Sequence, residues 1–205
     1  MTINRAPYKK YKCKNSKISL DWKFGGLDSN VIVQNEYLDV QILRYLIKDL
    51  NGEKLYDTIA IKEPKTNCVL VLLDSENKIG LVKEWRPIPS RWFWACIRGF
   101  GELNDKSSLS VARRELIEEI GEYKIQEIRK IGTLFQNTTY FENSIDIILL
   151  RIENKQNKNT FENGIVDLKF FENNEIREMI CSERIKDQLS LSSLAKYLMI
   201  LDLSK

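Results

Sequence analysis

The chain has 205 residues, a net charge of +3 at pH 7 and 43% hydrophobic residues, which suits one domain with a packed core and a small accessory piece. It contains no histidine, so a Ser-His-Asp triad, a histidine general base and a His-ligated zinc site are excluded. Acid–base chemistry would therefore fall to carboxylates, lysines, tyrosines or thiols, and a bound metal would be a hard cation held by oxygen atoms.

The cysteines and the hydropathy limit the kinds of metal site and the cellular location that we expect for the protein. The four cysteines lie far apart with no CxxC pair, so the spacing of a metal finger is absent. Cys68 and Cys96 lie in apolar segments, and we expect both to be reduced core residues. Because no apolar run is long enough to cross a bilayer and the N-terminus lacks a secretory signal, we expect a soluble, cytoplasmic protein with no membrane partner.

The charge is unevenly distributed along the chain. Residues 1–24 hold seven basic residues against Asp21 alone, a net charge of +6, which leaves −3 for the rest. Such a basic arm is either a solvated terminus or a contact for a polyanion such as nucleic acid. The second interpretation predicts binding that weakens steeply with salt. We favour the first, in which nucleic acid is not a partner.

Strand signals dominate the first half of the chain. Runs rich in β-branched, aromatic and aliphatic residues predict strands over 36–49 and 54–63. Two further apolar runs flank the polar turn 74–77 and predict a β-hairpin over 68–85. Another strand is expected over 91–99, ending in a loop that contains two glycines.

One helix is expected before a second set of strands. It begins near Ser107, which suits an N-cap, and Gly121 ends it after Ile120. The remaining elements are strands over 123–135, 144–152 and 164–171, then helices over 175–185 and 189–203. The last helix has an apolar stripe made of Leu191, Leu194, Leu198 and Leu201. This order predicts an α+β fold, which we divide into an N-terminal arm with a β extension over 1–50 and a main domain over 51–205.

The stretch "ARRELIEEIGE", from Ala112 to Glu122, carries an unusual acidic pattern. A helical wheel predicts one apolar face, made of Leu109, Ala112, Leu116, Ile117 and Ile120. An opposite arc of roughly 100° would hold the acidic residues Glu115, Glu118, Glu119 and Glu122. Glutamates three or four positions apart repel by ~0.2–0.5 kcal/mol per pair. A bound Mg²⁺ or Mn²⁺ would offset this repulsion, whereas the alternative is an ordinary solvated helix face.

The same stretch resembles a known family. "RELIEEIG" is similar to the second half of the Nudix box, G-x5-E-x7-R-E-U-x-E-E-x-G-U with U aliphatic. The matching residues are Arg114, Glu115, Leu116, Glu118, Glu119 and Gly121. The preceding "RGFGE" resembles the entry to the box, and "LVKEWRPIP" and "SERIKDQLSLSSLAKYL" resemble segments of ADP-ribose pyrophosphatase-like members. The similarity spans roughly residues 55 to 203.

The first half of the box departs from the family pattern. Counted back from Arg114, the glycine position falls on Phe100 and the first glutamate position on Lys106. Gly99 and Asp105 fit these positions only with one residue inserted before Arg114. Glu122 stands at the final aliphatic position, and Ala95 stands where many relatives that cleave ADP-ribose carry glutamate.

The resemblance implies a Nudix-like α/β/α sandwich with a mixed β-sheet over 51–205, and a set of site residues. Glu115 and Glu119 would be the principal metal ligands, Glu118 a further ligand or base, and Arg114 the residue that orients a box glutamate. The backbone carbonyl of Arg98 would be another ligand of Mg²⁺ or Mn²⁺, and Arg98 and Glu142 would also be substrate-binding residues. Glu142, with Asp146 as second choice, would supply a further carboxylate, and Arg86 would contact a phosphate through paired hydrogen bonds. Trp92, Phe93 and Trp94 are candidates to stack on a base, although strand alternation puts at least one of them in the core.

The function that the resemblance implies is hydrolysis of a nucleoside diphosphate linked to another moiety, with ADP-ribose or a nucleotide sugar as the leading substrate. The alternative is a Nudix-fold module that binds or senses a nucleotide with little turnover, which the incomplete first half of the box favours. The resemblance also implies a homodimer, since related enzymes pair through their N-terminal strands.

Overall fold

The computed structural model describes residues 9–12, 19–24, 31–34, 39–49, 52–63, 66–102, 104–153 and 161–204. The chain forms two compact units. The first unit comprises Met1–Pro64 and Asn137–Asn143, and the second comprises Lys65–Gln136 and Ser144–Lys205. Cys13 and the first eight residues of the basic arm lie outside the described residues.

The first unit contains an antiparallel sheet of five strands. These are β1 (Lys9–Lys12), β2 (Ser19–Phe24), β3 (Val31–Gln34), β4 (Asp39–Asp49) and β5 (Gly52–Lys62). The spatial order is β1-β2-β4-β3, and β5 also pairs with β4, from Asp39 opposite Lys62 to Asp49 opposite Gly52. The two early strands predicted from sequence are therefore present. The domain boundary at residue 50 stays a prediction, and the structure groups β5 with the strands before it.

The second unit contains a mixed sheet of seven strands. They are β6 (Asn67–Leu73), β7 (Ile79–Arg86), β8 (Arg91–Ala95), β9 (Arg98–Phe100), β10 (Ile125–Phe135), β11 (Ser144–Ile152) and β12 (Ile165–Phe171). The main order is β10-β11-β6-β7-β12, in which β11 and β6 run parallel and the other neighbours antiparallel. The expected strand over 91–99 is divided, because β8 pairs with β7 whereas β9 pairs with β6.

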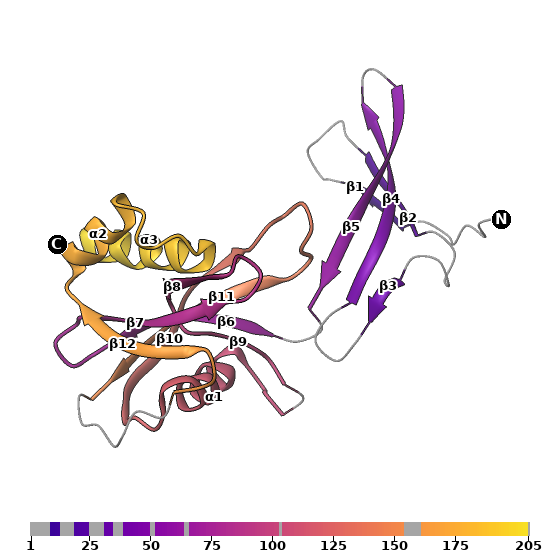
Figure 1. Cartoon of the computed structure of the whole chain (residues 1–205). Coiled ribbons are helices and arrows are strands. Elements are labelled where there is room, and N and C mark those ends of the chain that lie inside the picture. Colours follow the sequence, from indigo (N-terminus) through magenta and orange to yellow (C-terminus); the bar gives the residue numbers. More distant parts are fainter. Residues whose placement is uncertain are drawn as a thin grey trace. The chain divides into compact units, whose positions relative to one another are not determined.

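Helices cover both faces of this sheet (Figure 1). They are α1 (Ser108–Ile120), α2 (Asn173–Cys181) and α3 (Gln188–Leu203). The strand β6 shows why two layers are needed, because it is buried along its whole length. Its residues Cys68, Leu70 and Leu72 belong to the core on the α1 side. The alternate residues Val69, Val71 and Leu73 belong to the core that α2 and α3 cover.

The unit is therefore the α/β/α sandwich that the sequence predicted. The stripe on α3 packs into the second core as expected, with Leu194 and Leu198 buried and Leu191 and Leu201 packed against them. Cys68 and Cys96 are buried free thiols, as predicted. None of the helices in the described ranges has the length and hydropathy of a transmembrane segment.

Candidate active site

Local sequence fixes the two ends of α1. The hydroxyl of Ser107 accepts a hydrogen bond from the Ser110 amide, and the Ser107 amide donates to the Ser110 hydroxyl, which together form a capping box. Gly121 follows the last turn with φ of 97°, a conformation that favours glycine. These two signals set α1 where the sequence predicted it.

The apolar and acidic faces of α1 differ from the predicted wheel at two positions. Ile117, predicted to be apolar core, is 49% exposed. Glu119, predicted to lie on the outer acidic face, is only 7% exposed. The sheet and the loop around residue 162 cover one side of α1. The buried face of the helix therefore includes Glu119, which the helical wheel had placed on the exposed face. One of the four glutamates is thus a buried carboxylate.

Glycine at position 99 makes room for Glu115. A Cβ atom at Gly99 would overlap Cγ, Cδ and Oε1 of Glu115, so the glutamate lies directly over the bare backbone of β9. Glu115 is half-buried there, and its side chain also forms an ion pair with Arg114 at 2.8 Å. Burial raises the pKa of Glu115 to about 7, although the charge of Arg114 opposes the shift.

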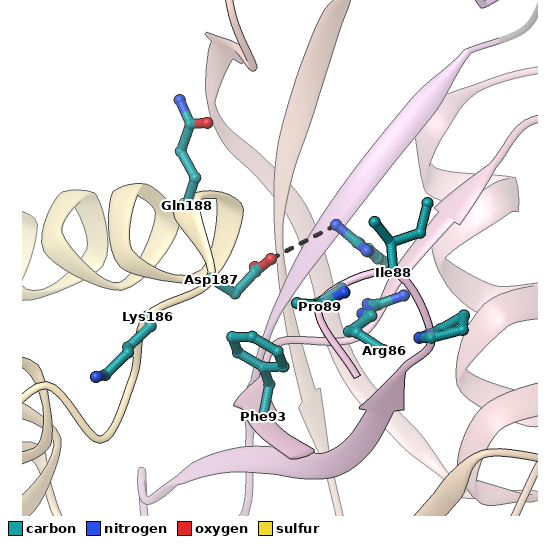
Figure 2. A pocket seen from close by; sticks show the side chains of 9 residues that line it. Arg86, Ile88, Pro89, Phe93, Lys186, Asp187 and Gln188 are labelled. Atoms are coloured by element: carbon teal, nitrogen blue, oxygen red, sulfur yellow. Dashed lines mark ion pairs between the residues drawn. The ribbon is translucent and has the colours of Figure 1, made fainter. Parts of the chain in front are cut away.

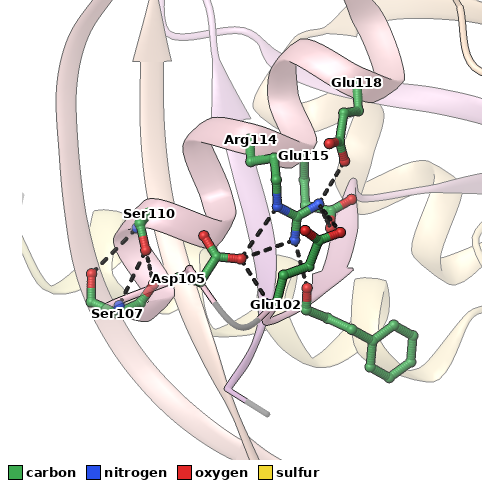
Figure 3. A network of polar contacts seen from close by, with 8 residues as sticks. Glu102, Asp105, Ser107, Ser110, Arg114, Glu115 and Glu118 are labelled. Atoms are coloured by element: carbon green, nitrogen blue, oxygen red, sulfur yellow. Dashed lines mark hydrogen bonds and ion pairs between the residues drawn. The ribbon is translucent and has the colours of Figure 1, made fainter. Parts of the chain in front are cut away.

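Arg114 is the centre of a polar network that ties α1 to the loop before it (Figure 3). Its guanidinium donates to the Asp105 carboxylate from Nε and Nη2, each at 3.2 Å, and to the carbonyl of Phe100 at 2.6 Å. On the other side it contacts Glu118 at 2.6 Å in addition to Glu115. Arg114 thus contacts a box glutamate, and its orienting role stays a prediction.

The network shows how the first half of the box is arranged. Asp105, not Lys106, pairs with Arg114, and Gly99, not Phe100, faces Glu115. Burial acts to raise the pKa of Asp105, but hydrogen bonds from the Glu102 amide and from Arg114 outweigh it and hold that pKa below its usual value. The structure therefore matches the pattern with one residue inserted between Asp105 and Arg114.

Glu119 is the most strongly perturbed carboxylate of the site. Burial raises its pKa to about 9, and the nearby charges of Glu84 and Glu115 add to the shift. One hydrogen bond acts in the opposite direction and lowers the pKa of Glu119, because the backbone amide of Arg98 donates to this carboxylate. The other oxygen, Oε2, is buried without a hydrogen-bond partner among the described residues.

Two further carboxylates belong to this site and were missed by sequence reasoning. Glu84 on β7 and Glu162 in the loop before β12 both contribute to the raised pKa of Glu119. The amide of Glu162 also donates to the backbone carbonyl of Glu119 at 3.2 Å. The odd position of Glu84, a charged residue in the strand "IGLVKEWR", is the one signal that the sequence offered for it.

These residues fit a hard divalent cation. Across the described ranges, no three His, Cys, Asp or Glu side chains are already gathered as a ligand set, and Glu115 and Glu118 pair with Arg114. An unpartnered carboxylate oxygen in a buried position is nevertheless costly unless something neutralises it. The charges of Glu84 and Glu115 act on Glu119, and carboxylates of this kind suit Mg²⁺ or Mn²⁺.

A pocket of about 470 Å³ lies in the same unit, beside the start of α3 (Figure 2). Pro87, Ile88, Pro89 and Phe93 give it an apolar wall. Positive charge comes from Arg86, Arg98 and Lys186, and the polar residues Asp187 and Gln188 complete it. Two of the predicted substrate residues, Arg86 and Arg98, are thus brought together, whereas Lys186 and Asp187 were not foreseen.

Arg86 links this pocket to the carboxylates. Its guanidinium forms an ion pair with Glu84 at 2.5 Å. Burial lowers the pKa of Arg86, and the positive charge of Arg98 lowers it further, while Glu84, Asp187 and Glu119 act in the opposite direction. The pocket and the buried carboxylate Glu119 therefore lie within electrostatic reach of each other.

The other predicted residues lie in several places. Glu142 belongs to the first unit, where it is exposed and 3.9 Å from Lys62. Asp146 on β11 accepts a hydrogen bond from Ser108 at 2.8 Å and pairs with Lys130 at 2.6 Å. The role of Glu142 stays a prediction.

The three aromatic residues on β8 differ in their surroundings. Phe93 lines the pocket. Trp94 packs edge-on against Phe171 at a ring distance of 5.4 Å and against the core, as strand alternation predicted. Trp92, on the same side of the strand as Trp94, packs edge-on against Trp85. Of the three, only Phe93 can therefore contact a molecule in the pocket through its present position.

Comparison with known proteins agrees with this geometry. The family model of the NUDIX domain matches residues 63–189. No curated protein sequence matches the chain. Among solved structures, 244 chains are similar. One of them, the crystal structure of an ADP compounds hydrolase, has a TM-score of 0.66 and 11% sequence identity, and the alignment covers 97% of this chain and 96% of that one. The chain therefore belongs to the Nudix family of hydrolases, which act on phosphoric anhydride bonds.

Proposed function

We propose that the protein is a metal-dependent pyrophosphohydrolase that cleaves a nucleoside diphosphate linked to another moiety, with ADP-ribose or a nucleotide sugar as the leading substrate. The observation that carries this proposal is the buried Glu119 carboxylate, which has an unpartnered oxygen and experiences the charges of Glu84 and Glu115. The name of the structurally similar ADP compounds hydrolase agrees with an ADP-containing substrate.

Glu115 and Glu119 would hold the cation, which we take to be Mg²⁺ or Mn²⁺, with Glu118 as a further ligand or base and the carbonyl of Arg98 as another ligand. Such a cation supplies neutralisation of the diphosphate charge and activation of water. Gly99 keeps Glu115 in position, and Arg114 holds its carboxylate from the side. Arg86 would contact a phosphate oxygen, and Glu142 is the carboxylate predicted from sequence to assist. We also propose a cytoplasmic homodimer with a small-molecule substrate.

The test uses a substitution that keeps the shape of the key side chain. Glu119→Gln removes the ability of the side chain to ionise and hold a cation while leaving its volume almost unchanged, so the fold should be retained. Release of AMP from ADP-ribose in Mg²⁺ should fall by about 100-fold or more. Glu122→Gln, at an exposed position just after the end of α1, is the matched control and should retain activity. Equal activity of Glu119→Gln and wild type would refute the site.

A second function is favoured by one specific observation. Glu115 and Glu118 both pair with Arg114, so two of the three box carboxylates are already engaged by a guanidinium. A protein that keeps this arrangement would bind a nucleotide with little turnover. Calorimetric binding in EDTA, measured beside turnover in Mn²⁺, distinguishes this module from a hydrolase.

A further inference from the structure

Glu84 on β7 faces the side of the sheet that α1 covers. Val82, two residues earlier, belongs to the core that contains Leu116 of α1, and residues two apart in a strand face the same side. The intervening residue Lys83 agrees with this alternation, because its Nζ lies 6.0 Å from the centre of the Trp94 ring, which packs against the opposite core. The Glu84 side chain is 17% exposed. It is therefore a largely buried carboxylate that points from the sheet toward the layer under α1.

Glu119 enters the same layer from the helix. The backbone amide of Arg98 on β9 donates a hydrogen bond to its carboxylate, so this side chain reaches the sheet. Its Oε2 atom is buried and has no hydrogen-bond partner among the described residues. Of the charged groups that act on Glu119, Glu84 has the largest effect, ahead of Glu115 one turn earlier in the same helix. A carboxylate of the sheet and a carboxylate of the helix thus act on each other in a buried layer.

Arg86 is the present partner of Glu84, and it does not fully compensate for the burial of this carboxylate. The two side chains are two positions apart on β7, and Nη2 of Arg86 lies 2.5 Å from Oε2 of Glu84. Burial still raises the pKa of Glu84, although the positive charges of Arg86 and Arg98 oppose the shift. Separating a buried ion pair is costly unless each ion finds another partner. A cation for Glu84 and a phosphate for Arg86 would be such partners.

We propose that Glu84 changes partner when the protein binds its cation: it leaves Arg86 and becomes a carboxylate ligand, supplied by β7, of the Mg²⁺ or Mn²⁺ that Glu119 holds. Hard cations prefer such oxygen ligands. The exchange agrees with the absence, across the described ranges, of three acidic side chains already gathered as a ligand set. It would also free donors of Arg86 beside the cation. This inference deepens the proposed function and rests on it for the presence of a cation.

The first experiment measures the affinity of the metal-free protein for Mn²⁺ by electron paramagnetic resonance, with no substrate present. Glu84→Gln removes a ligand while keeping the size of the side chain, so the affinity should fall by ~10-fold or more. Glu127→Gln is the matched control, because Glu127 on β10 also pairs with an arginine two positions later, Arg129 at 2.7 Å. The control should keep the affinity of the wild type. Equal affinity of Glu84→Gln and wild type would overturn the proposal.

A shorter side chain separates a ligand from a charge that acts at a distance. Glu84→Asp keeps the negative charge but withdraws the carboxylate by one methylene group. A ligand must reach the cation, whereas a charge acts over several ångströms, so this variant should also lose affinity for Mn²⁺. Full affinity in Glu84→Asp together with reduced affinity in Glu84→Gln would show that Glu84 acts through its charge alone, which contradicts the ligand role.

A substitution of Arg86 should act in the opposite direction, which a damaged fold cannot imitate. Arg86→Met removes the competing partner of Glu84, so the affinity for Mn²⁺ should rise. Loss of a positive charge would by itself raise the affinity equally whether or not Glu84 is present. The exchange predicts that the rise is smaller when Arg86→Met is combined with Glu84→Gln, a coupling that a double-mutant cycle measures. An equal rise in both backgrounds would refute the exchange.

Hydrolysis in Mg²⁺ separates this inference from the proposed function. If Mn²⁺ binding depends on Glu84 but neither ADP-ribose nor nucleotide sugars are hydrolysed, the pyrophosphohydrolase is refuted and the ligand role of Glu84 stands. If the wild type hydrolyses these compounds and its affinity for Mn²⁺ does not depend on Glu84, the ligand role is refuted and the pyrophosphohydrolase stands. Loss of both Mn²⁺ affinity and hydrolysis in Glu84→Gln supports both.

Discussion

Glu115 occupies the space that a side chain at Gly99 would fill. Gly99 therefore has a packing role, because its missing side chain leaves the space that the Glu115 carboxylate occupies. Gly99→Ala should displace Glu115 and lower Mg²⁺-dependent turnover by about 100-fold, because a shift of about 1 Å in a catalytic group has that effect. Steady-state kinetics on ADP-ribose measure the loss.

A second glycine provides the control for this substitution. A Cβ atom at Gly132 on β10 would meet its nearest neighbour, Cδ1 of Ile147, at 3.5 Å, an ordinary van der Waals distance. Gly132→Ala should therefore leave turnover and folding unchanged. Equal turnover by Gly99→Ala and Gly132→Ala would show that the space for Glu115 at position 99 is not needed for catalysis.

The pairing of Asp105 with Arg114 predicts that Asp105, and not Lys106, holds the loop before α1 against the helix. Asp105→Asn weakens two charged hydrogen bonds to a half-buried guanidinium, so the free energy of unfolding should fall by ~1–3 kcal/mol and activity should fall with it. Lys106→Met changes the exposed residue that the uninterrupted family pattern selects, and should have little effect. Urea denaturation measures the free energy of unfolding of both variants. A larger loss in Lys106→Met than in Asp105→Asn would favour the family pattern without an inserted residue.

The raised pKa of Glu119 predicts how the stability of the metal-free protein depends on pH. Its pKa is about 9 in the folded state against an ordinary value of 4.5, so the folded state holds this proton more tightly than the unfolded state. The contribution to stability is complete at acidic pH and is lost as the pH rises toward the folded pKa. In EDTA, Tm should therefore fall between about pH 5 and about pH 9 more steeply for wild type than for Glu119→Gln. Parallel Tm profiles would show that Glu119 does not titrate in this way.

Two carboxylates compete for the role of the assisting residue. Glu162 lies within electrostatic reach of Glu115 and Glu119 in the same unit, whereas Glu142 was selected from sequence and contacts Lys62 in the first unit. Glu162→Gln should therefore lower kcat by about 10-fold or more, and by more than Glu142→Gln does. A larger loss in Glu142→Gln would restore the choice made from sequence.

Sequence reasoning succeeded where the signals are local. Ser107 and Gly121 mark the ends of α1 because capping and positive φ depend on a few neighbouring atoms. The apolar run "CVLVLL" predicts the first strand of the hairpin over 68–85, and the structure has that strand, buried along its whole length. The family pattern then supplied Glu115, Glu119 and Arg114 in one helix.

The rest of the site depends on contacts between distant segments. The burial of Glu119 comes from the sheet and from the loop around Glu162, which no helical wheel contains. The inserted residue of the box is located only when Arg114 meets Asp105 in space. Asp187 joins the pocket because α3 begins beside β9, so nothing in the sequence around either residue connects it to Arg98.

Binding of Mn²⁺ to the metal-free protein, followed by electron paramagnetic resonance, tests the central claim most directly. The wild type should bind Mn²⁺ at the carboxylates of α1, and Glu119→Gln should lose this binding by about 10- to 100-fold in affinity while Glu122→Gln retains it. If Glu119→Gln binds Mn²⁺ as tightly as the wild type, the buried carboxylate does not hold the metal.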